Sequence, residues 1–100
     1  MSQRFFVAFV HRAQAWDPAL PPQEQAGFPD HARFVHGLEA TGFIAMAGMM
    51  LPSNDVLFVF RADSEAEVRS RMAEDPWQRD GHARLGRVEE GVFRIGAPGA

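Results

Sequence analysis

The amino-acid sequence predicts an α+β domain of the ferredoxin-like type, with the element order strand, helix, strand, strand, helix, strand (βαββαβ). Short apolar runs rich in β-branched and aromatic residues indicate strands, and two segments between them have helical spacing or a capping sequence. Only a Pro-Ser-Asn-Asp connection separates the second and third runs, which is typical of a hairpin. We therefore expect residues 1–100 to form one domain, a four-stranded antiparallel sheet with two helices on one face.

The first strand is expected over residues 5–10, an apolar run that His11 and Arg12 close. Because side chains alternate between the two faces of a strand, Arg12 should share a face with Val10. The prolines of residues 13–26 interrupt regular structure, so a long loop should follow this strand.

A helix is expected next, with a left-handed C-terminal cap at Gly42. Counting from His31, the residues three, four and seven positions further on are apolar, so this imidazole lies on the apolar stripe of the helix. His36 projects away from the stripe, toward solvent. Imidazole accepts or donates protons near neutral pH, so chemistry is expected beside His31. The alternative is a core histidine that is hydrogen-bonded to a backbone group or a buried acid.

The second half of the chain holds the hairpin, the second helix and the last strand. Gly48 predicts a bulge or a close backbone approach, and the charges of the last strand indicate a sheet edge. In order, we expect a strand over 43–51, a hairpin connection over 52–55, a strand over 56–60, and a helix that the capping box 64–67 opens and Asp75-Pro76 ends. A loop over 77–85, with one helical turn as the alternative, and a strand over 88–95 should complete the chain.

The first three strands lack a polar face, although an antiparallel sheet with one solvated face should alternate apolar and polar residues. Two helices cover only one face of a four-stranded sheet, so a second apolar face remains. We therefore expect a homodimer in which the sheets of two copies pack face to face.

Composition excludes several function classes. The chain has a net charge of −3, and its basic residues form no cluster, so neither a nucleic-acid nor a membrane partner is expected. The absence of Cys excludes disulfides and thiol catalysis. No compact metal-binding or nucleotide-binding motif is present, so we expect neither a metal nor another cofactor. No stretch has the form of a leader peptide or membrane span, so a cytoplasmic protein is expected.

Several short motifs follow one another along the chain: His11-Arg12, Trp16-Asp17-Pro18, Glu24-Gln25, Asp30-His31, Gly48, Ser64-Glu65-Ala66-Glu67 and Asp75-Pro76-Trp77. Their order and spacing resemble the YciI-like (YCII-related) domain family over most of the chain. The resemblance implies a single domain of that family and a dimeric α+β barrel. The family resembles muconolactone isomerases in fold, and a dehydrochlorinase that acts on a chlorinated hydroxyquinol belongs to it.

The resemblance also implies a candidate site formed by His31 and Asp75. At the end of the second helix a carboxylate is disfavoured, and a hydrogen bond from His31 would offset this and fix the imidazole tautomer; the alternative is a solvated helix-stop residue. Arg12 would bind a substrate carboxylate, or else form a surface salt bridge. Trp16 and Trp77 would wall a cleft for a planar ligand, or else complete the core.

These expectations together favour a cofactor-independent enzyme that uses His31 and Asp75 for proton transfer. The reaction would be of the isomerase or dehydrochlorinase (lyase) type, on a small organic acid or an aromatic-derived substrate. The alternative is a non-catalytic homodimer that binds a small molecule or has a regulatory role, since some related domains accompany sigma factors.

Overall fold

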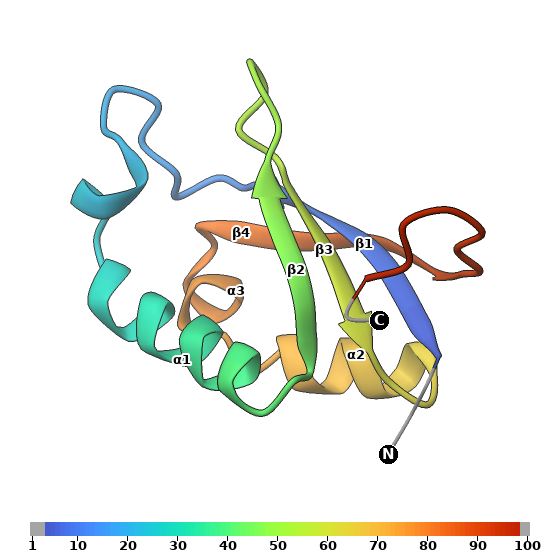
Figure 1. Cartoon of the computed structure of the whole chain (residues 1–100). Helices are drawn as coiled ribbons and strands as arrows, with labels where there is room; N and C mark the ends of the chain where they lie inside the picture. The colour runs from blue at the N-terminus through green and yellow to red at the C-terminus, as the bar shows by residue number, and fades with distance from the viewer. Residues whose placement is uncertain (1–3, 99–100) are drawn as a thin grey trace.

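The computed structural model describes residues 4–98 as an α+β fold, with an antiparallel sheet in the order β2-β3-β1-β4 (Figure 1). This architecture is compatible with the predicted ferredoxin-like type, and a short third helix is added to it. In chain order the elements are β1 (Phe5–Arg12), the 3₁₀ helix η1 (Pro22–Glu24), α1 (Phe28–Ala40), β2 (Ile44–Met49), β3 (Val56–Arg61), α2 (Glu65–Met72), α3 (Pro76–Asp80) and β4 (Ala83–Gly91).

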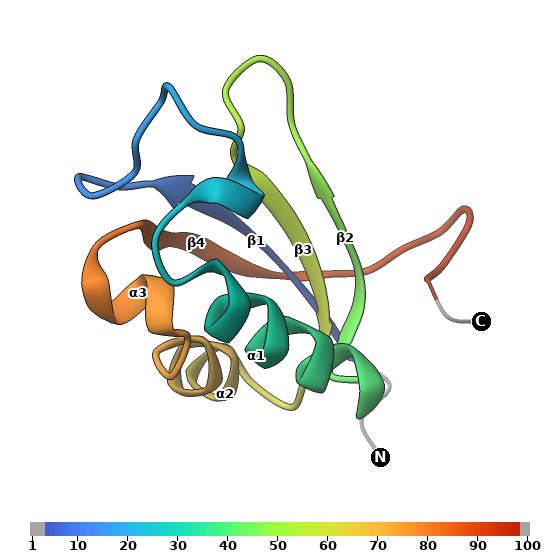
Figure 2. The ribbon, with the colours of Figure 1, turned by 90° about the vertical axis from the view of Figure 1, so that its left-hand side faces the viewer.

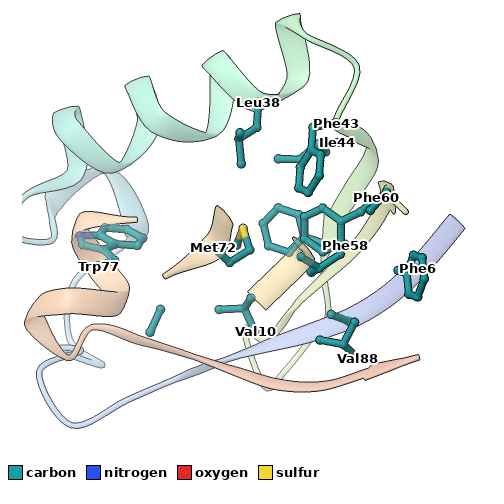
Figure 3. Packing of buried hydrophobic residues seen from close by; sticks show 14 residues of the cluster. Phe6, Val10, Leu38, Phe43, Ile44, Phe58, Phe60, Met72, Trp77 and Val88 are labelled. Carbon is teal, nitrogen blue, oxygen red and sulfur yellow. The ribbon is translucent and has the colours of Figure 1, made fainter. Parts of the chain in front are cut away.

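All three α-helices of the described residues lie on one side of the sheet (Figure 2). The sheet turns alternate residues of β1 and β3 toward them, so that Phe6 faces Phe60 and Ala8 faces Phe58 in the antiparallel register. These four side chains are at most 4% exposed and form the centre of the core. Figure 3 shows Trp77 at one end of this cluster. Among residues 4–98 no helix is long and apolar enough to cross a membrane.

Helix α1 confirms the predicted helix. Gly42 has φ +84°, the left-handed conformation expected just beyond the helix. Leu38 is buried against the sheet, and the side chain of His36 is 77% exposed on the opposite side. His31 lies in the first turns of the helix on the inner side, partly buried. The amphipathic spacing therefore predicted correctly which side of the helix each of the two imidazoles faces.

The bulge predicted at Gly48 is wrong, because the β2–β3 register instead shifts between Ile44 and Met46. A Cβ atom on Gly48 would meet nothing within 4 Å, so no close approach occurs there either. Strand β2 lies at the sheet edge and pairs only with β3, so neighbouring backbone does not crowd its outer side. Because of this bulge Ala45 has no partner in β3, and the residues after it change face. Met49 therefore points toward the helices, opposite Val56.

The predicted end of the second helix at Asp75 is wrong. Helix α2 stops at Met72, and Asp75 is instead the N-cap of α3, which contains Trp77. Proline keeps the preceding residue out of helical geometry, and Asp75 has ψ 126° as a result. The same extended backbone suits an N-cap, and Pro76 suits the first helical position. A carboxylate at Asp75 is therefore favoured by the nearest helix terminus.

The predicted range of the last strand, residues 88–95, is wrong, because the strand begins at Ala83 and ends at Gly91. β4 spans Ala83–Gly91 because it pairs with β1 along that strand's whole length, from Arg12 opposite Ala83 to Phe5 opposite Gly91. Beyond Gly91 no partner strand continues. The predicted edge position of this strand is confirmed.

The face of the sheet that turns away from the helices is apolar and partly exposed. Phe9 and Met46 are 41% and 51% exposed on this face, which we call the open face. Phe93 folds back from the chain after β4 and contacts the Phe5 ring edge-on, with centroids 5.7 Å apart. The expected two-sided apolar character is thus present, with one side unburied in the single chain.

Candidate active site

The His31 and Asp75 side chains, predicted to form a site, are in direct contact. Nδ1 of His31 lies 2.9 Å from Oδ1 and 3.0 Å from Oδ2 of Asp75. The Asp75 side chain is 2% exposed and that of His31 is 18% exposed. A carboxylate only accepts hydrogen bonds, so Nδ1 donates and the neutral imidazole carries its lone pair on Nε2. No other residue among 4–98 is hydrogen-bonded to Nε2, so this nitrogen is available to a ligand.

Asp75 is held in place by a second donor. Its Oδ1 accepts the backbone N–H of Trp77 at 3.0 Å, which is the N-cap bond of α3. One carboxylate therefore fixes the start of α3 and the orientation of the His31 ring. Since α1 packs against α3, this bond joins the two helices where the imidazole lies.

Trp77 packs against one face of the His31 imidazole. The rings of His31 and Trp77 are stacked, with centroids 3.8 Å apart and planes 12° apart. Trp77 is 1% exposed, and its Nε1 donates to the carbonyl of Ala26 at 2.9 Å. Phe28 adds a third ring, 6.0 Å from Trp77. The position of the His31 ring is thus fixed by the Trp77 indole, which stacks on its face, and by the Asp75 carboxylate, which is hydrogen-bonded to its edge.

Arg12 lies at the end of β1, on the helix side of the sheet as the alternation predicts. Its guanidinium stacks over the Trp16 ring at 3.9 Å and lies 5.9 Å from the Trp77 ring. Burial lowers the pKa of Arg12, and the charge of Asp55 partly offsets this. Arg12 forms no ion pair within residues 4–98, so the predicted surface salt bridge is not the arrangement found.

A cavity of about 240 Å³ connects these groups. His31, Asp75 and Arg12 are the ionisable residues in its wall, and the rest of the wall is apolar. Trp77 lines it, whereas Trp16 lies behind Arg12 and touches Trp77 edge-on. The other lining residues are Val10, Pro22, Phe28, Val35, Ala47, Met49, Val56, Phe58, Met72 and Ala83. A small apolar cavity with a few convergent polar groups is the usual form of a ligand site.

The loop after β1 closes one side of the cavity and is tied together by Gln25, which is 3% exposed. Its Nε2 donates to the carbonyls of Asp17 and Leu20, and its Oε1 accepts the N–H of Asp17. These bonds hold the loop so that Pro22 reaches the cavity wall. In the sequence Gln25 belongs to the Glu24-Gln25 motif but has no predicted role, because that role depends on three backbone groups that only the folded loop brings together.

His11 and His82 are also paired with acidic residues. Nδ1 of His11 lies 3.0 Å from Asp55, and Nδ1 of His82 lies 2.7 Å from Asp80. Neither pair lines the cavity. Within residues 4–98 no group of three His or acidic side chains is placed to hold a metal ion. The absence of a metal or other cofactor stays a prediction from the sequence.

No protein-family model matches the chain, and no curated protein matches its sequence.

Proposed function

We propose that the protein is a cofactor-independent enzyme that moves a proton on a small organic acid or aromatic-derived substrate. The observation that carries this proposal is the hydrogen bond from His31 Nδ1 to buried Asp75, in the wall of an apolar cavity. An imidazole whose second nitrogen is free and whose first is oriented by a carboxylate is the acid–base half of a catalytic triad. The reaction type is an isomerisation or an elimination such as a dehydrochlorination.

In the proposed step, Nε2 of His31 takes a proton from an acidic carbon of the substrate, and the electron pair stays on the substrate. The imidazolium that forms keeps its Nδ1 proton and is stabilised by the Asp75 carboxylate. In an isomerisation the Nε2 proton returns to another carbon of the delocalised anion. In an elimination the electron pair forms a double bond and expels chloride, and solvent later removes the proton from His31.

The alternative is a non-catalytic small-molecule-binding or regulatory dimer. It is supported by the second bond of Asp75, since a carboxylate that caps α3 has a structural reason to be present. In that case His31 would orient a bound ligand and take no proton from it.

Deuterium exchange tests the proposal because it detects removal of a substrate proton whatever product forms. Muconolactone and a chlorinated hydroxyquinol, the substrate types that the resemblance implies, are incubated with the protein in D₂O and followed by NMR. Exchange or turnover of at least one probe is expected, and His31→Asn should slow it by roughly 10²- to 10⁴-fold. His36→Asn, on the exposed side of the same helix, is the matched control and should leave the rate unchanged. If a probe binds but the wild type and both variants catalyse neither exchange nor turnover, the result would instead support the non-catalytic role.

We also propose that the protein is a homodimer in which two open faces pack together, as in a dimeric α+β barrel. Phe9→Asp should give a folded monomer, because a charge at the centre of a desolvated interface is strongly unfavourable. Ala66→Asp, on an exposed position of α2, is the control and should remain dimeric. Sedimentation at micromolar concentration, with circular dichroism to confirm folding, measures the effect. A wild-type protein that sediments as a monomer would refute the dimer.

A further inference from the structure

One edge of the Arg12 guanidinium has no oxygen acceptor in the described residues. Nε is buried and has no hydrogen-bond partner among residues 4–98. Within the same residues, the neighbouring Nη2 meets only the Met49 sulfur, at 3.9 Å. A thioether is a weak acceptor, and leaving a buried charged donor unpaired is unfavourable. The Nε–Nη2 edge therefore lacks the strong partner that a half-buried guanidinium normally has.

The contact of Arg12 with Trp16 leaves the Nε–Nη2 edge free to bind a ligand. The Arg12 Cζ atom lies over the Trp16 ring at 3.9 Å, so that ring covers the guanidinium and does not supply a hydrogen-bond acceptor to its edge. Two parallel N–H groups on that edge match the two oxygens of a carboxylate.

The Met49 side chain covers the Nε–Nη2 edge of Arg12 and is free to rotate away from it. Met49 lies on edge strand β2, is 44% exposed, and lines the same cavity as His31. Its side chain has three rotatable bonds, and its contact with Nη2 is weak. A ligand oxygen would form a stronger bond than the sulfur does, so displacing this side chain costs little.

The rest of the cavity limits the ligand. Its walls are apolar apart from Arg12, His31 and Asp75, and its volume of about 240 Å³ lies below the range usual for drug-sized ligands. Asp75 already carries a negative charge there, so a second anionic group on the ligand would be repelled. We infer that the Nε–Nη2 edge of Arg12 is a carboxylate anchor gated by Met49, and that the site takes a compact monocarboxylate with an apolar body. This inference deepens the proposed function, because it names the substrate class for the cavity that contains His31.

The probe for this inference is benzoate, with benzamide as its neutral counterpart. Binding is followed by calorimetry and by tryptophan fluorescence, since Trp77 lines the cavity and Trp16 packs on Arg12. Benzoate should bind the wild-type protein more tightly than benzamide does. Arg12→Gln should weaken benzoate binding roughly 10- to 100-fold and leave benzamide nearly unaffected, because only the acid uses the guanidinium edge. Arg87→Gln, at an exposed arginine of β4, is the matched control and should bind benzoate like the wild type.

Two variants test the gate. Met49→Glu places a carboxylate of the protein on the Arg12 edge and should abolish benzoate binding. Met49→Leu keeps the volume, removes the sulfur acceptor, and should bind benzoate at least as tightly as the wild type. Equal affinity of the two Met49 variants for benzoate would overturn the inference, and so would equal affinity of the wild type and Arg12→Gln. Failure of benzoate to bind the wild type at millimolar concentration would also overturn it.

The outcome is separable from that of the proposed function. His31→Asn should retain Arg12-dependent benzoate binding, since the anchor does not use the imidazole. If benzoate binding depends on Arg12 but no probe undergoes exchange, the anchor stands and the catalytic proposal fails. If exchange depends on His31 but benzoate binding does not depend on Arg12, the anchor fails and the catalytic proposal stands.

Discussion

Replacing Trp77 with alanine is expected to lower the free energy of unfolding by about 3–5 kcal/mol, the range for deleting a large aromatic side chain from a core. Trp77 is 1% exposed and contacts the rings of Trp16, Phe28, His31 and His82. Removal of the indole would leave a cavity between these rings. Since domains of this size have about 5–15 kcal/mol of stability, the variant should be close to unfolding at 25 °C.

Urea denaturation followed by circular dichroism measures this effect. Trp16→Ala is the matched control, because Trp16 is only partly buried and packs against one edge of Trp77. It should lower the stability by clearly less than Trp77→Ala does. Equal losses for the two variants would show that Trp77 does not hold the site and the core together as we describe.

Removing the Asp75 carboxylate is the second large effect that we expect. Asp75→Ala loses the cap of α3, worth about 1 kcal/mol, and a buried bond between charged or polar groups, worth about 1.5–3 kcal/mol. Asp75→Asn keeps an oxygen that can cap Trp77, since Asn is as good an N-cap as Asp. The loss in Asp75→Asn therefore measures the negative charge beside His31, and the further loss in Asp75→Ala measures the oxygen that Trp77 and His31 share.

A double-mutant cycle completes this test. Asp75→Asn and His31→Ala are combined, and the stabilities of the four proteins are compared by urea denaturation. Groups in direct contact should show an interaction energy of roughly 0.5–3 kcal/mol, whereas groups without contact should be additive. The Nδ1 proton of His31 should also shift in the NMR spectrum of Asp75→Asn. Additive stabilities with an unchanged Nδ1 resonance would mean that the pair is not formed in solution.

Local sequence signals predicted much of the fold. The helical spacing around His31 and the left-handed residue at Gly42 each depend on a few neighbouring residues, and the structure has both. The capping box is confirmed in part, because Ser64 accepts the N–H of Glu67 but the Glu67 carboxylate accepts the N–H of Asp63 instead of that of Ser64. Such features are decided within one or two turns of chain, so a short stretch of sequence is enough to predict them.

The errors arose where the outcome depended on distant partners. Whether Asp75-Pro76 ended one helix or began another depended on what Trp77 packs against, since both choices satisfy the backbone restriction before proline. The bounds of β4 follow from the length of β1, to which it pairs. For the same reason no local pattern indicated Met49 in the cavity wall, because simple alternation from Ile44 places it on the open face.

The displaced residue at Ala45 has a consequence for how this protein could diversify. Because β2 pairs on one side only, drawing Ala45 into the ladder opposite Val59 would move each later residue of β2 by one place against β3 and exchange every side chain from Met46 onward between the two faces. Met49 would leave the cavity and its neighbours in β2 would enter it, while His31, Asp75 and Trp77 stayed on their helices. Deletion of Ala45 would instead remove the bulge and leave Met49 in the cavity wall, opposite Val56. A chain of the same length that pairs without the bulge would thus alter ligand choice without touching the His31–Asp75 pair. Related chains with different ligands should therefore differ in whether β2 is bulged at this point.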